Sequence, residues 1–373
     1  MAGRAVTGAQ SVGRGSTTMS RWFALFLCFA STSLFAHKNS DSYLYIASEQ
    51  WRLDIAVEDL QRIYDLDTNP VDGRVTAKEL RGATMGLEAS ILKGIRVTRE
   101  GGDCPLKLQR LGVASHSGEY YAAWGLKSPC FAEPDRLTLN YDLLFDVDPL
   151  HRLLYRNDVA EQPLLGVLTP SERALALQSH GPWATVTAFF KEGVLHMVLG
   201  YDHLLFLLAL LLPLVRTSSS DESLRPLLWR CAGVVTAFTV SHSITLTAAT
   251  LGWWQLPIQP VEIVIALSIS VAALAALVGE RHRFQWQLAG GFGLIHGFGF
   301  ASMLAGLMDE GSGAVLALAS FNIGVEAAQL VVTVALVPLL VYCQKKPFYT
   351  RWGYPAVLLA VAATGLWWAW QRV

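Results

Sequence analysis

The stretch Glu192-Gly-Val-Leu-His-Met-Val-Leu-Gly-Tyr-Asp-His203 places four ionisable side chains inside an apolar run long enough to cross a bilayer. Charge inside a membrane span costs a few kcal/mol or more, so such residues face a bundle interior or a water-filled path. On a continuous helix, four residues would lie on one face about one turn apart, namely Glu192, His196, Gly200 and His203. Imidazoles on either side of a glycine would leave room for an ion. The alternative is a pair of hydrogen-bonded histidines that serve only packing.

Composition indicates a membrane protein with a polar domain attached. Of 373 residues, 52% are hydrophobic and 16% are charged. The apolar residues are concentrated after about position 185, whereas the preceding part of the chain is polar. The formal net charge of -1 provides no basic surface for a phosphate backbone, which argues against nucleic acid as a partner.

The first 36 residues are typical of a signal peptide. Arg21 precedes an apolar run over residues 22–35 that ends at Ala36 and is short for a membrane span. Met19 is an alternative start, and an uncleaved anchor helix is the alternative to cleavage. With cleavage, residues 37–185 form an extracytoplasmic domain and residues 186–373 form the membrane domain.

Cysteine placement follows from this export. Cys104 and Cys130 are the two cysteines of residues 37–185. An oxidising compartment favours a disulfide between them, which would stabilise the domain by a few kcal/mol. The pair lacks the close cysteine or histidine spacing of a zinc site.

The exported domain has strand-like segments separated by turn residues. Strands are expected over residues 95–99, 120–124 and 136–147, with Gly-Gly, Ser-Gly and Pro signals between them. These patterns predict a β-rich α+β domain of sandwich type at the N-terminus.

A short segment of this domain resembles a calcium-binding loop. Gly73, Val75 and Glu79 occupy the positions at which an EF-hand loop needs a turn glycine, an apolar residue and a bidentate carboxylate. The front of the loop is displaced by an insertion that contains Pro70. The candidate calcium ligands are Asp65, Asp67, Asp72 and Glu79. The alternative is a helix-turn-helix that keeps only the shape of the motif.

The C-terminal half predicts a multi-span α-helical membrane protein. The six candidate spans cover residues 188–212, 229–251, 260–279, 286–308, 314–342 and 353–371. Lys and Arg residues are concentrated in the loops after the first, third and fifth spans, which the positive-inside rule assigns to the cytoplasm. Both the N-terminal domain and the C-terminus then lie on the extracytoplasmic side, and a bacterial inner membrane is the expected location.

Ligand-type side chains recur at matching depth in these spans. The second span carries Thr239, His242 and Ser243, and the fourth carries His296. The fifth carries Asn322, Glu326 and Gln329 on one helix face. A rise of about 1.5 Å per residue brings four of these side chains near mid-bilayer, namely His203, His242, His296 and Glu326. Residues that serve only helix packing need not converge on one plane.

These residues carry a resemblance to a known family. The pattern His196-x5-Asp202-His203, with Gly200 before the Asp-His pair, resembles the first-helix motif of the HupE/UreJ family of nickel and cobalt permease-like membrane proteins, in its branch with an N-terminal extension. Similarity extends to the segments 238–243 and 321–326. Metal-transporting members carry a second histidine-glycine motif with two histidines, whereas only the pair His296-Gly297 stands here.

The resemblance implies a divalent metal ion as substrate, and imidazole with carboxylate support suits Ni²⁺ or Co²⁺. The expected metal ligands are His196, His203, His242 and His296. The residues expected to orient them or to balance charge are Glu192, Asp202, Ser243, Asn322 and Glu326.

Two other classes remain open. An intramembrane hydrolase would hold zinc and an activated water on the same histidines, and Ser241 or Ser243 beside His242 would be its candidate nucleophile. A non-transporting assembly factor would instead bind a protein partner through the exported domain. No nucleotide-binding loop motif occurs, so ATP-driven pumping by this chain alone is not expected.

A repeated segment suggests how transport would work. The pattern Gly-x-x-His occurs at Gly193–His196 and again at Gly293–His296, in spans predicted to run in opposite directions. A three-plus-three inverted repeat with its site at the repeat interface would permit alternating access. Chance similarity is the alternative.

Overall fold

The computed structural model describes residues 40–64, 66, 75, 77–116, 119–159, 163–177, 181–218, 222–254, 256–279, 282–305, 307 and 312–373. The predicted signal peptide lies outside the described residues. So do Asp65, Asp67 and Asp72 of the calcium-loop prediction, whereas Glu79 is in the first turn of a short helix, α3.

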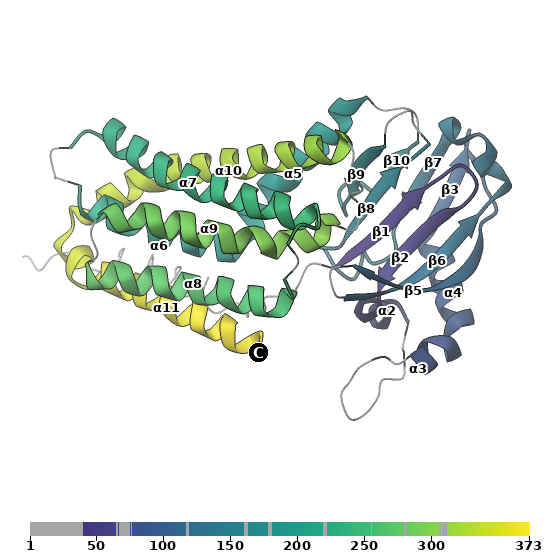
Figure 1. Cartoon of the computed structure of the whole chain (residues 1–373), viewed down its shortest axis with the longest axis horizontal. Coiled ribbons are helices and arrows are strands. Elements are labelled where there is room, and N and C mark those ends of the chain that lie inside the picture. The colour runs from purple at the N-terminus through teal and green to yellow at the C-terminus, as the bar shows by residue number, and fades with distance from the viewer. Residues whose placement is uncertain are drawn as a thin grey trace, which may run out of the picture. The chain divides into compact units, whose positions relative to one another are not determined.

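The N-terminal domain contains two β-sheets. The first has six strands in the order β5-β6-β2-β1-β8-β9, and the second has four in the order β10-β7-β3-β4 (Figure 1). The strands are β1 (Asp41–Ile46), β2 (Trp51–Ala56), β3 (Ile95–Arg99), β4 (Gly102–Asp103), β5 (Lys107–His116), β6 (Glu119–Lys127), β7 (Leu137–Tyr141), β8 (Arg152–Asn157), β9 (Leu164–Leu168) and β10 (Ala174–Ala176). The helices of this domain are α2 (Val57–Ile63), α3 (Ala77–Gly82) and α4 (Thr84–Gly94), with short 3-10 turns at Pro129–Ala132 and Pro134–Arg136.

The two sheets share one core. It joins residues of the six-stranded sheet such as Trp51 and Leu153 to residues of the four-stranded sheet such as Val97 and Leu139, and α4 closes it with Ile91. The domain is therefore β-rich with packed sheets, as the turn spacing predicts. The expected strand over residues 136–147 was too long: β7 ends at Tyr141 and the chain then turns.

The six-stranded sheet is buried on its second face as well. Successive residues of a strand point to opposite faces, so Leu153 lies in the core between the sheets while Leu154 lies in a separate core. That second core combines Leu154 and Val167 with helix residues such as Phe189 and Phe321. The N-terminal domain thus packs its second sheet face on the helices of the C-terminal half.

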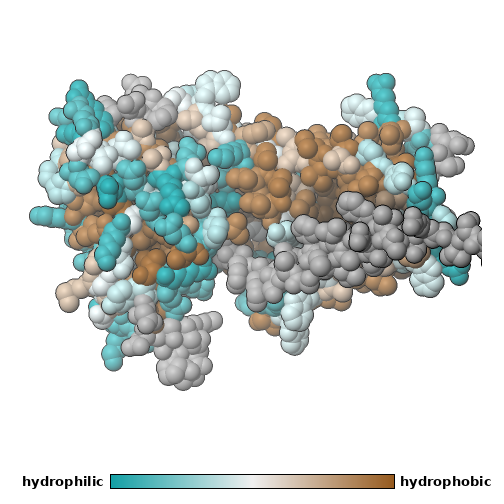
Figure 2. Space-filling view, turned by 180° about the vertical axis from the view of Figure 1, so that it is seen from behind, coloured by the Kyte–Doolittle hydropathy of each residue, from teal (hydrophilic) through white to brown (hydrophobic). Residues whose placement is uncertain are grey.

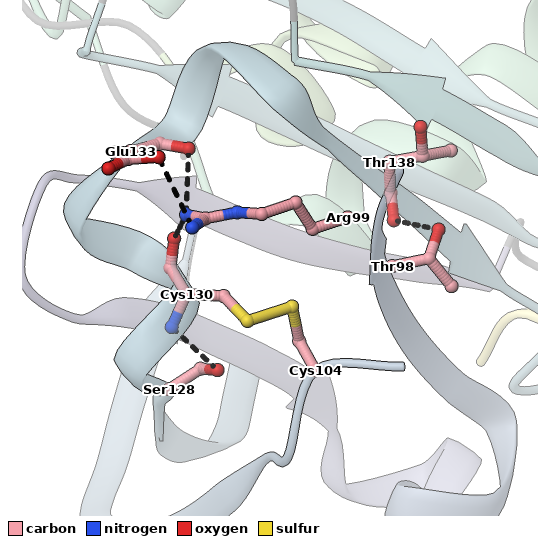
Figure 3. The surroundings of a disulfide bond; sticks show 7 residues. All are labelled: Thr98, Arg99, Cys104, Ser128, Cys130, Glu133 and Thr138. Atoms are coloured by element: carbon pink, nitrogen blue, oxygen red, sulfur yellow. Dashed lines mark hydrogen bonds and ion pairs between the residues drawn. A yellow bond between two sulfur atoms is a disulfide. The ribbon is translucent and has the colours of Figure 1, made fainter. Parts of the chain in front are cut away.

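A disulfide joins Cys104 to Cys130, with their Cα atoms 6.1 Å apart (Figure 3). It ties the segment after β4 to the 3-10 turn that begins at Pro129. Ser128 Oγ accepts a hydrogen bond from the backbone N–H of Cys130 at 3.3 Å, and Arg99 donates to the Cys130 carbonyl. This is the pairing expected from the oxidising compartment.

The C-terminal half is helical. Its helices are α5 (Pro182–Leu199), α6 (Tyr201–Arg216), α7 (Leu224–Thr250), α8 (Ile258–Val278), α9 (His282–Ala305), α10 (Ser312–Gln344) and α11 (Tyr354–Gln371), with a π-helical turn at Tyr349–Gly353. The principal helix pairs are α5 with α10, α7 with α9, and α8 with α11. Figure 2 shows apolar side chains gathered over these helices. Exposed apolar residues of the helices include Val240, Val271 and Val331.

Four helices of the described residues are long and apolar enough to cross a membrane, namely α7, α8, α10 and the segment that contains α11. A fifth span results if the bent pair of α5 and α6 is one span. The predicted fourth span, α9, is not among them. The predicted span over residues 286–308 extends past the described residues, so six spans remains a prediction.

Candidate metal centre

The first predicted span is not one continuous helix. It breaks at Gly200, and the helices α5 and α6 on either side are bent by 67°. The prediction that Glu192, His196 and His203 share one face of a straight helix was therefore wrong. A Cβ at Gly200 would overlap the His196 carbonyl oxygen and would lie 2.9 Å from His203 Nδ1. Glycine is needed here because the two histidines close around the break.

Four imidazoles meet at this break. His203 lies at the centre, with its ring centroid 4.6 Å from that of His196, 6.1 Å from that of His242 and 5.3 Å from that of His296. The His196 and His242 centroids are 6.4 Å apart. These residues come from α5, α6, α7 and α9. The structure thus brings together the four histidines that were expected to be metal ligands.

Three of the four rings are buried and His196 is partly exposed, and the cluster is short of hydrogen bonds. His203, His242 and His296 are 8%, 0% and 2% exposed. Neither ring nitrogen of His203 or His242 has a hydrogen-bond partner among the described residues, and the same holds for His196 Nε2 and His296 Nδ1. Buried polar atoms normally have partners, so unpartnered nitrogens in this number call for an explanation.

The four rings are close to one another, but their nitrogen atoms are not arranged around a common ion position. Among the described residues, no three His, Cys, Asp or Glu side chains are already arranged to hold a metal ion. Imidazoles that bind one ion through nitrogens at about 2.1 Å have ring centroids roughly 4.5 to 6.5 Å apart. The four ring separations given above fall in this range, so rotation of the rings would bring their nitrogens closer to a common ion.

One hydrogen bond determines which nitrogen of His296 is available. Ser268 Oγ lies 3.0 Å from His296 Nε2 and donates its own proton to the Ile265 carbonyl at 2.6 Å. The hydroxyl can therefore only accept from His296, which assigns the proton to Nε2. Nδ1, buried and without a partner among the described residues, then carries a free lone pair. This is the arrangement in which a neighbouring group orients a metal-binding imidazole.

Asp202 has a different partner from the one expected. Its Oδ2 accepts from Arg372 Nη2 at 2.9 Å, and Arg372 Nη1 donates to the Glu262 carbonyl. Since the nitrogens of His203 have no partner in the described part of the chain, Asp202 does not orient that ring. The carboxylate instead ties the start of α6 to the C-terminus of the chain, because it lies about 100° around the helix from His203.

The polar residues of α10 lie to one side of the imidazoles. Glu326 Oε1 accepts from Thr236 Oγ1 at 2.6 Å, and its Oε2 has no hydrogen-bond partner among the described residues. Thr236 precedes His242 by six residues on α7, which is about 9 Å along the helix axis. Asn322 donates to the Leu318 carbonyl of its own helix at 2.8 Å.

The serines next to His242 bond to their own helix. Ser241 Oγ donates to the Ala237 carbonyl at 2.8 Å, and Ser243 Oγ donates to the Thr239 carbonyl at 2.7 Å. Since neither nitrogen of His242 has a partner among the described residues, no serine-histidine nucleophile pair is formed there.

Glu192 lies one helical turn from His196, toward the N-terminal domain. Its Oε2 is 2.8 Å from Arg152 Nε, at the first residue of β8, and the two side chains are 5% and 6% exposed. This ion pair crosses from the N-terminal domain to α5. It was not anticipated from the sequence, because Arg152 lies forty residues away in an ordinary strand.

Glycines let the helices that carry the histidines pack closely. A Cβ at Gly193 of α5 would overlap the Phe321 carbonyl oxygen of α10. A Cβ at Gly293 of α9 would likewise overlap the Phe238 carbonyl oxygen of α7. The two Gly-x-x-His segments therefore pack in the same way, each against the carbonyl of a phenylalanine.

Sequence patterns alone missed two residues that contact the site, Arg152 and Ser268. Ser268 was detectable in principle, because it is a small polar residue inside the apolar span 260–279. Its partner could not be chosen, since nothing in a single sequence indicates which helix α8 contacts.

The fold and the cluster define an integral membrane protein with buried imidazoles among its helices. The model of the HupE/UreJ protein family matches residues 171–372, and the chain belongs to that family. The match covers the helical half and begins just before β10, so most of the N-terminal domain lies outside it. No curated protein and no solved structure matched the chain. Membership confirms the resemblance drawn from the first-helix motif and makes this a membrane protein related to metal transport.

Proposed function

We propose that this protein binds a divalent transition-metal ion, Ni²⁺ or Co²⁺, at the four-imidazole cluster and carries it across the membrane. The observation that supports this most is the set of buried ring nitrogens on His196, His203, His242 and His296 that have no hydrogen-bond partner within the described ranges. Neutral imidazoles are the preferred ligands of these ions. They also hold an ion less tightly than a cage of carboxylates would, which favours release.

Two carboxylates come from the helices around the cluster. Glu192 is one turn from His196 on the side of the N-terminal domain, and Glu326 lies beside Thr236, toward the predicted cytoplasmic end of α7. Positive-inside orientation makes Glu192 the extracytoplasmic group and Glu326 the cytoplasmic one. A cation on its way through would meet a carboxylate, then the imidazoles, then a second carboxylate.

The helix arrangement is consistent with alternating access through an inverted repeat. The His196 ring lies 5.4 Å from that of Phe321, and the His296 ring lies 5.2 Å from that of Phe238. The relation between α5 and α10 is thus repeated between α9 and α7. A break in the helix at Gly200, directly at the site, is a further feature of secondary transporters.

Uptake of Ni²⁺ into liposomes that contain the purified protein tests the proposal. His203→Ala removes the central ring and should abolish uptake, whereas His116→Ala, in the N-terminal domain, should leave it unchanged. Metal analysis of the protein separates transport from intramembrane zinc hydrolysis: tightly held stoichiometric zinc, together with no Ni²⁺ or Co²⁺ uptake, would contradict the proposal. Uptake unaffected by His203→Ala would contradict the site.

A further inference from the structure

Arg152 and Glu192 form a buried ion pair that joins the N-terminal domain to the helix that carries His196. Apolar residues lie nearby, since Leu154, two residues along the same strand, packs in one core with Phe189 and Phe321. The buried Asp41 of β1 is the register partner of Arg152. The Arg152 backbone N–H donates to the Ser40 carbonyl at 3.0 Å, so strand pairing holds this residue in place.

Stability does not explain this pair. Removing two charges from water costs several kcal/mol per ion, and apolar residues of similar volume stabilise an interface at least as well. Arg152 Nη1 is buried and has no hydrogen-bond partner among the described residues, so the guanidinium is not fully compensated. A buried, incompletely paired charge next to a proposed ion path is more readily explained by function.

We propose that Arg152 is a tethered cation that closes access to the imidazole cluster from the side of the N-terminal domain. The guanidinium is permanently charged and occupies the position beside Glu192 that an entering metal ion would take. A divalent ion opens the path by displacing Arg152 from the carboxylate. The inference rests on the proposed function, and it assigns to the N-terminal domain the role of an outer gate.

Competition of this kind has a measurable consequence. The apparent affinity of a site falls in proportion to the fraction of molecules in which the site is accessible. Without the guanidinium, Ni²⁺ should bind the purified protein more tightly, by roughly tenfold for each 1.4 kcal/mol of competition removed. Glu192→Gln should act in the opposite direction, because it removes the carboxylate that attracts the ion.

The first test is calorimetric titration of the full-length protein in detergent with Ni²⁺. Arg152→Gln is expected to lower the dissociation constant. Arg156→Gln is the matched control: it lies two residues along β8 and contacts Asp158 and the Leu307 carbonyl, so its loss should not change the affinity. Equal affinities for the wild type, Arg152→Gln and Arg156→Gln would overturn the gate while leaving the metal site intact.

The second test does not depend on metal binding. A membrane-impermeant maleimide, added on the side of the N-terminal domain, should label the His196→Cys variant when it also carries Arg152→Gln, but not when Arg152 is retained. Arg152→Gln leaves Glu192 buried without its partner. The double variant Arg152→Gln/Glu192→Gln is neutral at both positions, so it is measured beside the single variant. It should also be labelled. Labelling without Ni²⁺ binding would support the gate and contradict the proposed function. Unchanged labelling in both variants would overturn the gate.

Discussion

The rings of His196 and His203 lie 4.6 Å apart although the helix that would join them is broken between them. The break at Gly200 turns α6 away from α5 by 67°. On a straight helix both rings would lie along one stripe; here they lie on two helix ends that meet.

Gly200→Ala should weaken Ni²⁺ binding. The added Cβ would overlap the His196 carbonyl oxygen and crowd His203 Nδ1 at 2.9 Å, so the two rings must move apart. We expect a loss of at least roughly tenfold in affinity, equivalent to about 1.4 kcal/mol, measured by titration of the purified protein. Gly291→Ala is the control, because a Cβ at Gly291 meets nothing within 4 Å. Equal affinities for the two variants would show that the break is not needed for the site.

Ser268→Ala should weaken metal binding without loss of a ligand. It removes the acceptor that holds the proton of His296 on Nε2, and loss of such an orienting group typically reduces metal affinity about 10- to 100-fold. Ser270→Ala is the matched control on the same helix, since the Ser270 hydroxyl donates to the Ala362 carbonyl of α11. If both serine variants bind Ni²⁺ equally, Ser268 has only a packing role.

The N-terminal domain should lose stability as the pH falls below about 6.5, the ordinary pKa of histidine. His151 is fully buried, with Ser40 Oγ 2.6 Å from its Nδ1 and Tyr141 Oη 3.0 Å from its Nε2. Burial lowers the pKa of His151 to about 4. Between these two values the unfolded chain binds a proton that the folded chain does not, so acidification favours unfolding, by about 2 kcal/mol at pH 5.

Burial also raises the pKa of Asp59, to which Ser40 donates a hydrogen bond. This carboxyl takes up a proton earlier in the folded state and opposes the effect of His151. Comparison of variants separates the two groups. The difference in unfolding temperature between the wild type and His151→Gln should shrink from pH 7 to pH 5. Tyr141→Phe, which retains the imidazole, should keep the pH dependence of the wild type, whereas parallel curves for the wild type and His151→Gln would contradict the assignment.

The sequence by itself was sufficient for the class of protein, the family and the histidines. A long apolar segment crosses a membrane as a helix, because its backbone N–H and C=O groups must be hydrogen-bonded within the segment. Ionisable residues are rare in such helices, so His203, His242 and His296 could be recognised at one depth. The disulfide followed from counting cysteines in an oxidising compartment. These conclusions depend on composition and on periodicity along one helix, both of which a linear chain displays.

Tertiary structure decided which groups meet. The helix break at Gly200, the partner of Asp202, the support of His296 by Ser268 and the pairing of Glu192 with Arg152 all depend on contacts between segments far apart in the chain. A helical period indicates which side of a helix is polar, but not which neighbour that side faces. The side chains that orient the candidate ligands and close the path to them were therefore found only once the helices and the sheet had been packed together.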